Sequence, residues 1–314
     1  MIHFIFFMVL LLLELFYFKI ADRFNIIDKP NLRSSHTEIT IRGGAIVFPI
    51  AVVMAYILGY ASWGLTLAVV LSAAISFIDD IQPLPTTPRF VVHSIAILLI
   101  FYDLEVFGQL GWLLPVLFIF YLGWVNVFNF MDGINGITVL YALVALSTFW
   151  YLESDAQMQS LLVLALLSCL VFAFFNVRKK AKAFAGDVGS ISIAIFLGYC
   201  LLQLLFKTEQ LGYLFFFSVY GVDALITILN RIRKKEKLTE AHRSHLYQYL
   251  ANEKRIPHLV VSFMYALLQL AINVVVMYLI AINVFTYVVF AIMLFIMVVV
   301  CLLLRYWATK EIKA

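Results

Sequence analysis

Charged residues are scarce in this chain. Only 13% of its 314 residues are Asp, Glu, Lys or Arg, whereas 64% are hydrophobic and the mean hydropathy is +1.02. A water-soluble domain of this length has too small an interior to bury so much apolar surface. The composition therefore excludes a soluble globular protein and indicates a protein whose solvent is mainly the lipid bilayer.

Cysteine is also rare. Cys169, Cys200 and Cys301 all lie inside apolar runs, which predicts buried packing residues and argues against a disulfide or zinc framework. The sequence contains no internal repeat, low-complexity tract or soluble domain. The net charge of +4 comes from the loops between apolar runs, so it gives no indication of nucleic-acid binding.

Long apolar runs dominate what is present. Each run is near the length needed to cross a hydrocarbon core of about 30 Å at about 1.5 Å per residue. Because a backbone in lipid must satisfy its own hydrogen bonds, we predict an all-α polytopic membrane protein, a single integral membrane domain over residues 1–314. The eleven predicted spans are 3–19, 43–60, 62–78, 90–106, 111–128, 136–152, 159–176, 189–206, 211–229, 258–280 and 284–304. The first has neither a basic leader nor a small-residue cleavage site, so we expect a retained helix.

The orientation follows from the distribution of Lys and Arg. These residues gather in alternate loops, whereas the intervening loops are acidic and hold Lys207 as their only cation. The positive-inside rule then places the N-terminus outside and the C-terminal tail in the cytoplasm. The polar length, and with it the expected chemistry, lies on the cytoplasmic face.

Two adjacent aspartates, Asp79 and Asp80, end the third predicted span. Neighbouring carboxylates repel each other unless a cation or a shared proton relieves them, and at a helix C-terminus they also oppose the helix dipole. Solvated caps are the alternative, but ionisable groups at the membrane edge favour a functional site. Arg89, one short loop later, is positioned to hold a phosphate.

The end of the fifth predicted span carries three oxygen-bearing side chains at a spacing of three residues: Asn129, Asp132 and Asn135. This spacing puts Asn129 beside Asp132, and Asp132 beside Asn135, on one helical face. Hard oxygen ligands that only partly surround an ion suit Mg²⁺ bound to phosphate oxygens. An Asx-rich cap and turn between two spans is the alternative interpretation.

Polar residues also border the next inner loops. Asn176 follows a span and Asp187 precedes one, where Asp187 would either cap the helix or bind a metal ion. Arg42 precedes Gly43 and Gly44, and this pair either presents free N–H groups to an anion or lets helices pack closely.

The longest inner loop, residues 231–255, contains His242, Arg243 and His245. Without further Cys or His nearby, this group suits a pyrophosphate better than zinc. Asp223, inside the ninth predicted span, either lines the cleft or pairs with a cation.

Taken together and in order, these motifs resemble the polyprenyl-phosphate N-acetylhexosamine-1-phosphate transferases of glycosyltransferase family 4 type. The resemblance covers residues 20–255. It rests on the acidic pair, on Asn-x-x-Asn-x-x-Asp-Gly-x-Asn-Gly from Asn126, on Phe-x-Gly-Asp-x-Gly-Ser from Phe184, and on the His-rich loop. Arg33-Ser-Ser-His36 and His242-Arg-Ser-His-Leu-Tyr-Gln248 are similar to the branch that initiates O-antigen and other surface glycans.

The resemblance implies transfer of an N-acetylhexosamine 1-phosphate from a UDP-sugar to undecaprenyl phosphate, with release of UMP. It implies Mg²⁺, with Mn²⁺ as an alternative, and contact with membrane lipids; a homodimer is left open. The implied roles are catalysis for Asp79 and Asp80, with Asp79 as the base, and metal binding for Asp187 with Asn129 or Asp132. Substrate binding falls to Asn135, Asn176, Arg42, Arg89, His242, Arg243 and His245.

Two departures from the family pattern stand out. Arg89 replaces a Lys found in many relatives, and the stretch from Asn176 to Asp187 is one residue longer than usual. Direct attack and an aspartyl-phosphate route use the same residues. The competing functions are an ion-coupled transporter and a lipid-phosphate hydrolase.

Overall fold

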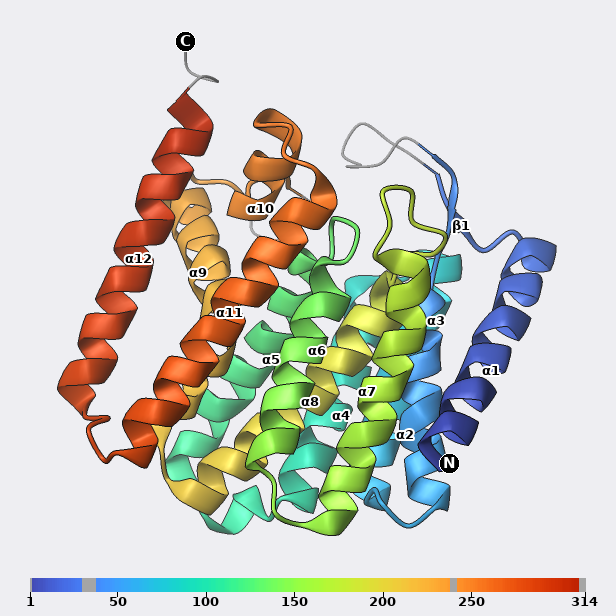
Figure 1. The fold of residues 1–314 in the computed structure, drawn as a ribbon, viewed down its shortest axis with the longest axis horizontal. Helices are drawn as coiled ribbons and strands as arrows, with labels where there is room; N and C mark the ends of the chain where they lie inside the picture. Colours follow the sequence, from blue (N-terminus) through green and yellow to red (C-terminus); the bar gives the residue numbers. More distant parts are fainter. Residues whose placement is uncertain (1, 30–37, 238–241, 311–314) are drawn as a thin grey trace.

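The chain folds into a bundle of antiparallel helices, described by a computed structural model for residues 2–29, 38–237 and 242–310 (Figure 1). The long helices are α1 (Ile2–Phe24), α2 (Val47–Ile57), α3 (Trp63–Ile81), α4 (Thr86–Asp103), α5 (Leu114–Met131), α6 (Ile137–Leu152), α7 (Ala156–Asn176), α8 (Gly186–Thr208), α9 (Ser218–Arg233), α11 (His258–Ala281) and α12 (Tyr287–Thr309). The short elements that bear on the site are antiparallel strands β1 (Ile27–Asp28) and β2 (Thr40–Ile41), the 3₁₀ turns Gly44–Ile46 and Leu211–Phe217, α10 (Leu246–Gln248) and the π-turn Tyr249–Glu253.

Each of the eleven predicted spans coincides with one of these long helices. Eight helical segments are long and apolar enough to cross a bilayer, and the helices over Gly44–Ile57 and Ile137–Leu152 are shorter but also apolar. The eleventh long helix, α4, belongs to neither group. An all-α polytopic membrane protein is therefore confirmed, while the number of complete crossings stays a prediction.

Helix α8 occupies the centre of the bundle. Its residues from Val188 to Leu202 are all buried, which explains why it is apolar on every side. Glycines let its neighbours approach closely: a Cβ on Gly189 would collide with Ala45, and one on Gly198 would lie 2.5 Å from Tyr121 Oη. The start of α8 is thereby fixed against the segments on either side.

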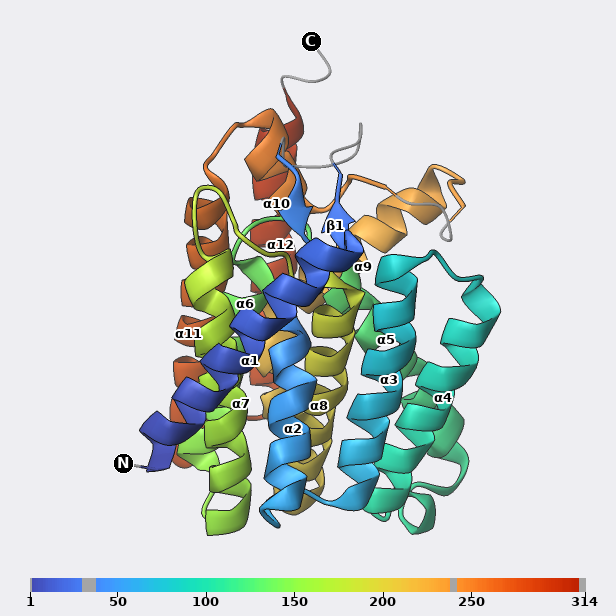
Figure 2. The same cartoon turned by 90° about the vertical axis from the view of Figure 1, so that its right-hand side faces the viewer.

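The polar connections gather at one end of the bundle. The two strands, the α7–α8 connection and α10 lie at the end where the chain terminates, and the N-terminus lies at the opposite end (Figures 1 and 2). Ile41 of β2 also bridges to Ala183 in the α7–α8 connection. The predicted alternation of loops is thus confirmed. Cys169, Cys200 and Cys301 are free and buried, as expected.

Candidate active site

A polar pocket of about 200 Å³ opens among the connections at this end. Six residues predicted to form the site line it: Arg42, Asn129, Asp132, Asn135, Asn176 and Asp187. They come from the residue after β2, the end of α5, the α5–α6 loop, the end of α7 and the start of α8. Side chains up to 145 positions apart therefore meet around one space, as the sequence predicts.

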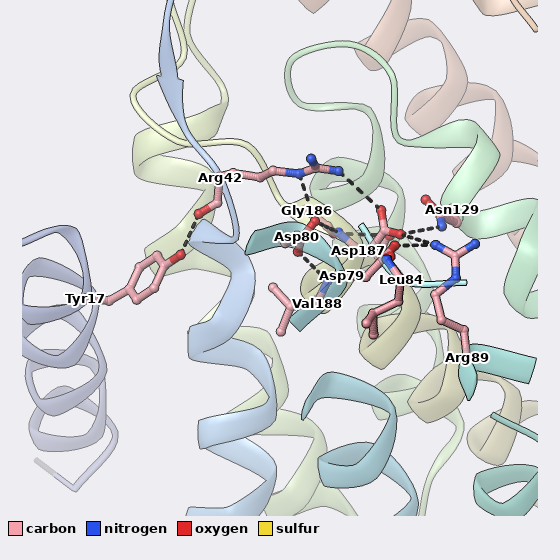
Figure 3. A network of polar contacts seen from close by, with 11 residues as sticks. Tyr17, Arg42, Asp79, Asp80, Leu84, Arg89, Asn129, Gly186, Asp187 and Val188 are labelled. Carbon is pink, nitrogen blue, oxygen red and sulfur yellow. Dashed lines mark hydrogen bonds and ion pairs between the residues drawn. The ribbon is translucent and has the colours of Figure 1, made fainter. Parts of the chain in front are cut away.

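Asp187 stands in the first turn of α8 between two arginines (Figure 3). Its carboxylate lies 3.9 Å from Arg42 Nη2 and 3.6 Å from Arg89 Nη1, and it accepts a hydrogen bond of 3.2 Å from Asn129 Nδ2. These contacts are long, and the residue faces the pocket. Asp187 is therefore an acid with binding capacity left for a ligand.

Asp80 is the residue that caps α8. Its two carboxylate oxygens accept the backbone N–H groups of Asp187 and Val188 at 3.0 Å each, and Oδ1 also lies 2.8 Å from Arg42 Nε (Figure 3). The side chain of Asp80 is fully buried. Of the two alternatives for Asp187, capping is thus wrong, because an aspartate from α3 already fills that position. Gly186 makes room for Asp80, since a Cβ there would lie 2.5 Å from Asp80 Oδ2.

Asp79 points to a different arginine. It forms an ion pair with Arg89 and accepts the N–H of Leu84 at 2.6 Å. Arg42 relieves Asp80 and Arg89 relieves Asp79, which is how two adjacent carboxylates are accommodated. Arg89 also reaches Asp187, so it links the acidic pair to the pocket.

Asp132 follows α5 directly and lines the same pocket. Loss of hydration raises the pKa of Asp132 to about 7, helped by the negative charge of Asp187. A carboxyl with a raised pKa gains most from a nearby cation. Asp132, Asp187 and the amide oxygen of Asn129 make up a hard oxygen donor set of the kind that Mg²⁺ prefers.

These three donors would surround a metal ion only in part. Among the residues that the structure describes, no three His, Cys, Asp or Glu side chains are gathered closely enough to hold a metal ion alone. Mg²⁺ usually binds through one or two carboxylates together with water and substrate phosphates. The residues present fit an ion held in that manner.

Asn135 and Asn176 tie the surrounding loops together. Asn176 Oδ1 accepts the N–H of Gly136 at 2.8 Å and its Nδ2 donates to Ala183 O, while Asn135 Nδ2 donates to Arg178 O at 2.9 Å. Both residues line the pocket, so they shape it. Their predicted contact with a nucleotide stays a prediction.

The glycine pair packs closely. Gly44 N donates to Phe184 O at 2.8 Å, and a Cβ on Gly44 would lie 2.6 Å from the Cβ of Ala183. The N–H group of Gly44 is therefore occupied, and the structure favours helix packing over an anion-binding turn.

His242, Arg243 and His245 lie beside the pocket without lining it. His245 is only 1% exposed, and its Nδ1 lies 3.7 Å from Asp223 Oδ1. Loss of hydration, reinforced by the neighbouring His245 and Arg231 side chains, lowers the pKa of His242 to about 4. His242 is thus neutral near pH 7 before a ligand arrives, and contact of His242, Arg243 and His245 with pyrophosphate stays a prediction. Of the remaining motif, Arg33 to His36 lies outside the described residues.

Asp223 is buried and does not line the polar pocket; His245 Nδ1 lies 3.7 Å from its carboxylate, and pairing with a cation stays a prediction. Asp223 accepts Leu246 N and the Tyr265 hydroxyl, each at 2.8 Å. Three further residues line the pocket without a predicted role: Asp28, Gln248, which ends the His242–Gln248 motif, and His258. The only available signal for His258 is its position at the start of an inner-facing span.

Comparison with known proteins agrees with the motifs. Residues 62–205 match the family model described as glycosyl transferase family 4. The chain is 26% identical over 260 residues to a probable undecaprenyl-phosphate N-acetylglucosaminyl 1-phosphate transferase of Bacillus subtilis, covering 74% of this chain and 71% of that one.

Two phospho-N-acetylmuramoyl-pentapeptide-transferases are also similar. The protein of Listeria welshimeri is 24% identical over 48% of this chain and 56% of its own length, and that of Nitratiruptor is 27% identical over 49% and 48%. The chain spans about half the length of these two relatives. With the ordered motifs and the helical membrane fold, these matches support the resemblance to the polyprenyl-phosphate hexosamine-1-phosphate transferases.

Proposed function

We propose that this protein transfers an N-acetylhexosamine 1-phosphate from a UDP-sugar to undecaprenyl phosphate and releases UMP. One observation carries the proposal: Asp187, Asp132 and Asn129 line one polar pocket at the membrane edge, with Arg42 and Arg89 beside Asp187. Oxygen ligands beside fixed cations suit a reaction between two anionic phosphates, whose repulsion must be screened before an oxygen attacks phosphorus.

Asp187, Asp132 and Asn129 would hold Mg²⁺, or Mn²⁺ as the alternative. When bound, the ion supplies positive charge to the phosphates of the donor. Arg42, which lines the pocket, and Arg89, which lies beside Asp187, bind phosphate oxygens. Asn135 and Asn176 hold the loops on the nucleotide side of the pocket in place. His242, Arg243 and His245 contact the sugar or pyrophosphate from the neighbouring loop.

Asp79 accepts the proton from the lipid phosphate. The carboxylate contacts Arg89, which also reaches Asp187, so the base lies next to an arginine that binds phosphate. Asp80 acts through α8, since it holds the turn that carries Asp187.

The lipid acceptor reaches the site from the bilayer. An apolar groove of about 310 Å³ runs between α2 and α3, and its lining includes Phe77 and Val188. Val188 donates its N–H to Asp80, so the groove ends one residue from the acidic cluster. A prenyl chain in this groove leaves its phosphate at headgroup depth.

The site faces the cytoplasm in this proposal, with the N-terminus outside and the protein in the bacterial inner membrane. The loops at the pocket end carry nearly all the cations, which supports this orientation. The pathway is the initiation of O-antigen or a related surface glycan, because the His242–Gln248 segment resembles that branch. The protein acts either alone or as a homodimer.

The test is to incubate purified protein with radiolabelled UDP-GlcNAc, Mg²⁺ and undecaprenyl phosphate. Lipid-linked label together with UMP is the expected result. Free inorganic phosphate would instead indicate a lipid-phosphate hydrolase, and the absence of both products with every UDP-sugar of a panel would contradict a transferase. That panel, which includes UDP-GlcNAc and the 6-deoxy sugars UDP-QuiNAc and UDP-FucNAc, identifies the donor.

A further inference from the structure

A second large cavity lies away from the acidic pocket, between α9, α11 and α12. Its volume is about 600 Å³, and its walls are apolar apart from Asp223 and the Tyr265 hydroxyl. From their short connection, α11 and α12 diverge toward the end of the bundle that carries α10, and α9 lies behind them (Figure 1). We call this cavity the α9–α12 crevice.

Hydrocarbon is the only material that suits this crevice. Both polar groups in its wall are already satisfied, because the Tyr265 hydroxyl donates to Asp223 and Asp223 accepts the N–H of Leu246. An apolar cavity of about 150 Å³ takes up benzene, so one roughly four times larger accommodates a long chain. The helices around it are membrane spans, and of the residues in α12 only Cys301 and Ala308 are buried.

Positive charge marks the loop end of the crevice. Arg305 follows the wall residue Leu304, and its guanidinium donates to Ser244 O at 2.6 Å and lies 5.3 Å from the ring centroid of Tyr249. The ammonium group of Lys254 lies 4.8 Å from the ring centroid of Trp307, one turn further along α12. Two cations above an apolar crevice complement an anionic headgroup attached to a chain.

The roof of the crevice is also a wall of the active site. Leu246 and Leu250 line the crevice, whereas Gln248, between them in sequence, lines the polar pocket. Tyr247 donates its hydroxyl proton to Phe130 O at 2.9 Å and packs against Gly133, directly after Asp132. The short segment around α10 therefore separates the two cavities and contacts both.

We propose that the α9–α12 crevice binds one acyl chain of an anionic membrane phospholipid, whose phosphate lies near Arg305 and Lys254. The chain fills the space beneath Leu246 and Leu250 and so stabilises the position of Gln248 and Tyr247 at the active site. α10 and Tyr247 stand between the crevice and the Asp132 loop, which favours a resident phospholipid over the lipid substrate. The protein is in this sense a transferase with a structural lipid.

The binding test does not depend on catalysis. Native mass spectrometry of wild type purified from membranes and then supplied with phosphatidylglycerol should show one retained phospholipid per chain. Leu304→Trp, in the crevice wall, should reduce the retained fraction at least fivefold. Leu303→Trp is the matched control: Leu303 is 63% exposed and outside the lining, whereas Leu304 is 38% exposed and within it. Leu267→Trp, from the α11 wall, repeats the test if Leu304→Trp does not fold.

The functional arm compares nanodiscs of phosphatidylglycerol and phosphatidylcholine. Wild type and Leu303→Trp should turn over several-fold faster with phosphatidylglycerol, and Leu304→Trp should lose this preference. Equal lipid retention by both variants, or no retained phospholipid in wild type, would overturn the proposal. A protein that retains the lipid in the crevice but transfers no sugar phosphate would refute the proposed function and leave this site standing.

Discussion

Two aspartates in membrane helices, Asp187 and Asp223, have opposite surroundings. Asp187 has two arginines at 3.6 and 3.9 Å and one amide at 3.2 Å, and it faces a polar pocket. Asp223 accepts a backbone N–H and a tyrosine hydroxyl at 2.8 Å each, with Thr227 at 3.3 Å and His245 at 3.7 Å. The first carboxylate is only loosely paired, and the second is satisfied.

This difference distinguishes a carboxylate that can bind a ligand from one that stabilises the fold. Any ionisable residue inside a membrane span suggests function, so the sequence alone does not distinguish Asp187 from Asp223. What distinguishes them is how fully the folded protein satisfies the charge. A satisfied carboxylate holds the elements around it together, whereas a loosely paired one beside a pocket can exchange a partner for a ligand.

The largest effect on activity is expected for Asp187→Asn. The metal would lose a charged ligand, so turnover should fall by about 100-fold or more. The apparent Tm in detergent should change little, because Asn retains the shape and α8 stays capped by Asp80. Near-normal turnover at saturating Mg²⁺ would reject the metal-binding role of Asp187.

Asp223→Asn should show the reverse pattern. Both carboxylate oxygens of Asp223 accept hydrogen bonds, and the amide of Asn replaces one of them with a donor. A buried donor left unsatisfied costs about 1–3 kcal/mol, so this variant should lose more stability than Asp187→Asn does. Thermal unfolding of both variants in one detergent provides the comparison. Equal Tm values would mean that the two carboxylates do not differ in the way the structure indicates.

The pH dependence of Mg²⁺ activation comes next in size. Because the pKa of Asp132 is raised to about 7, its carboxyl becomes protonated as the pH falls below 7, and a metal ion binds only the charged form. The apparent Mg²⁺ affinity should therefore fall up to about tenfold per pH unit below 7. Titrating turnover with Mg²⁺ between pH 6 and 8.5 measures this.

The same group affects stability without metal. Between its unfolded pKa of 3.8 and about 7, the folded protein keeps a proton that the unfolded chain releases. The free energy of unfolding should therefore decrease as the pH rises through this window, and Asp132→Asn should flatten the decrease. Asp132→Asn with an unchanged pH profile would assign the titration to another group.

The smallest effect is expected for Tyr247→Phe. It removes the hydrogen bond to Phe130 O that links α10 to the end of α5, which is worth about 1 kcal/mol. Turnover should fall less than tenfold, with a small decrease in Tm. Tyr56→Phe, at a half-exposed position in α2, is the control and should behave as wild type. A loss as large as that of Asp187→Asn would place Tyr247 in the chemistry itself.

Much of the architecture follows from local sequence. All eleven predicted spans coincide with helices, because an apolar run long enough to cross lipid has few other structures to adopt. The alternation of the spans then brings Asp79, Asp132 and Asp187 to one end, even though no local pattern connects them. The assignment of these residues to one face needs only the helix lengths and the order of the loops.

The partners of each side chain could not be predicted in the same way. Asp80 caps a helix that begins more than 100 residues later, and His245 is buried against Asp223 from another helix. Asp28, Gln248 and His258 reach the pocket from three separate segments, and the sequence assigns none of the three side chains a role in the site.

By itself, the sequence determined that this protein is a helical membrane protein with its three aspartate motifs and most of its cations at one end, because hydropathy and charge act residue by residue. Only the tertiary structure decided which acids are already satisfied and which still face a pocket. Hydrogen-bond partners are supplied by neighbours in space, and the distances that decide between a cap and a ligand arise only when the helices pack.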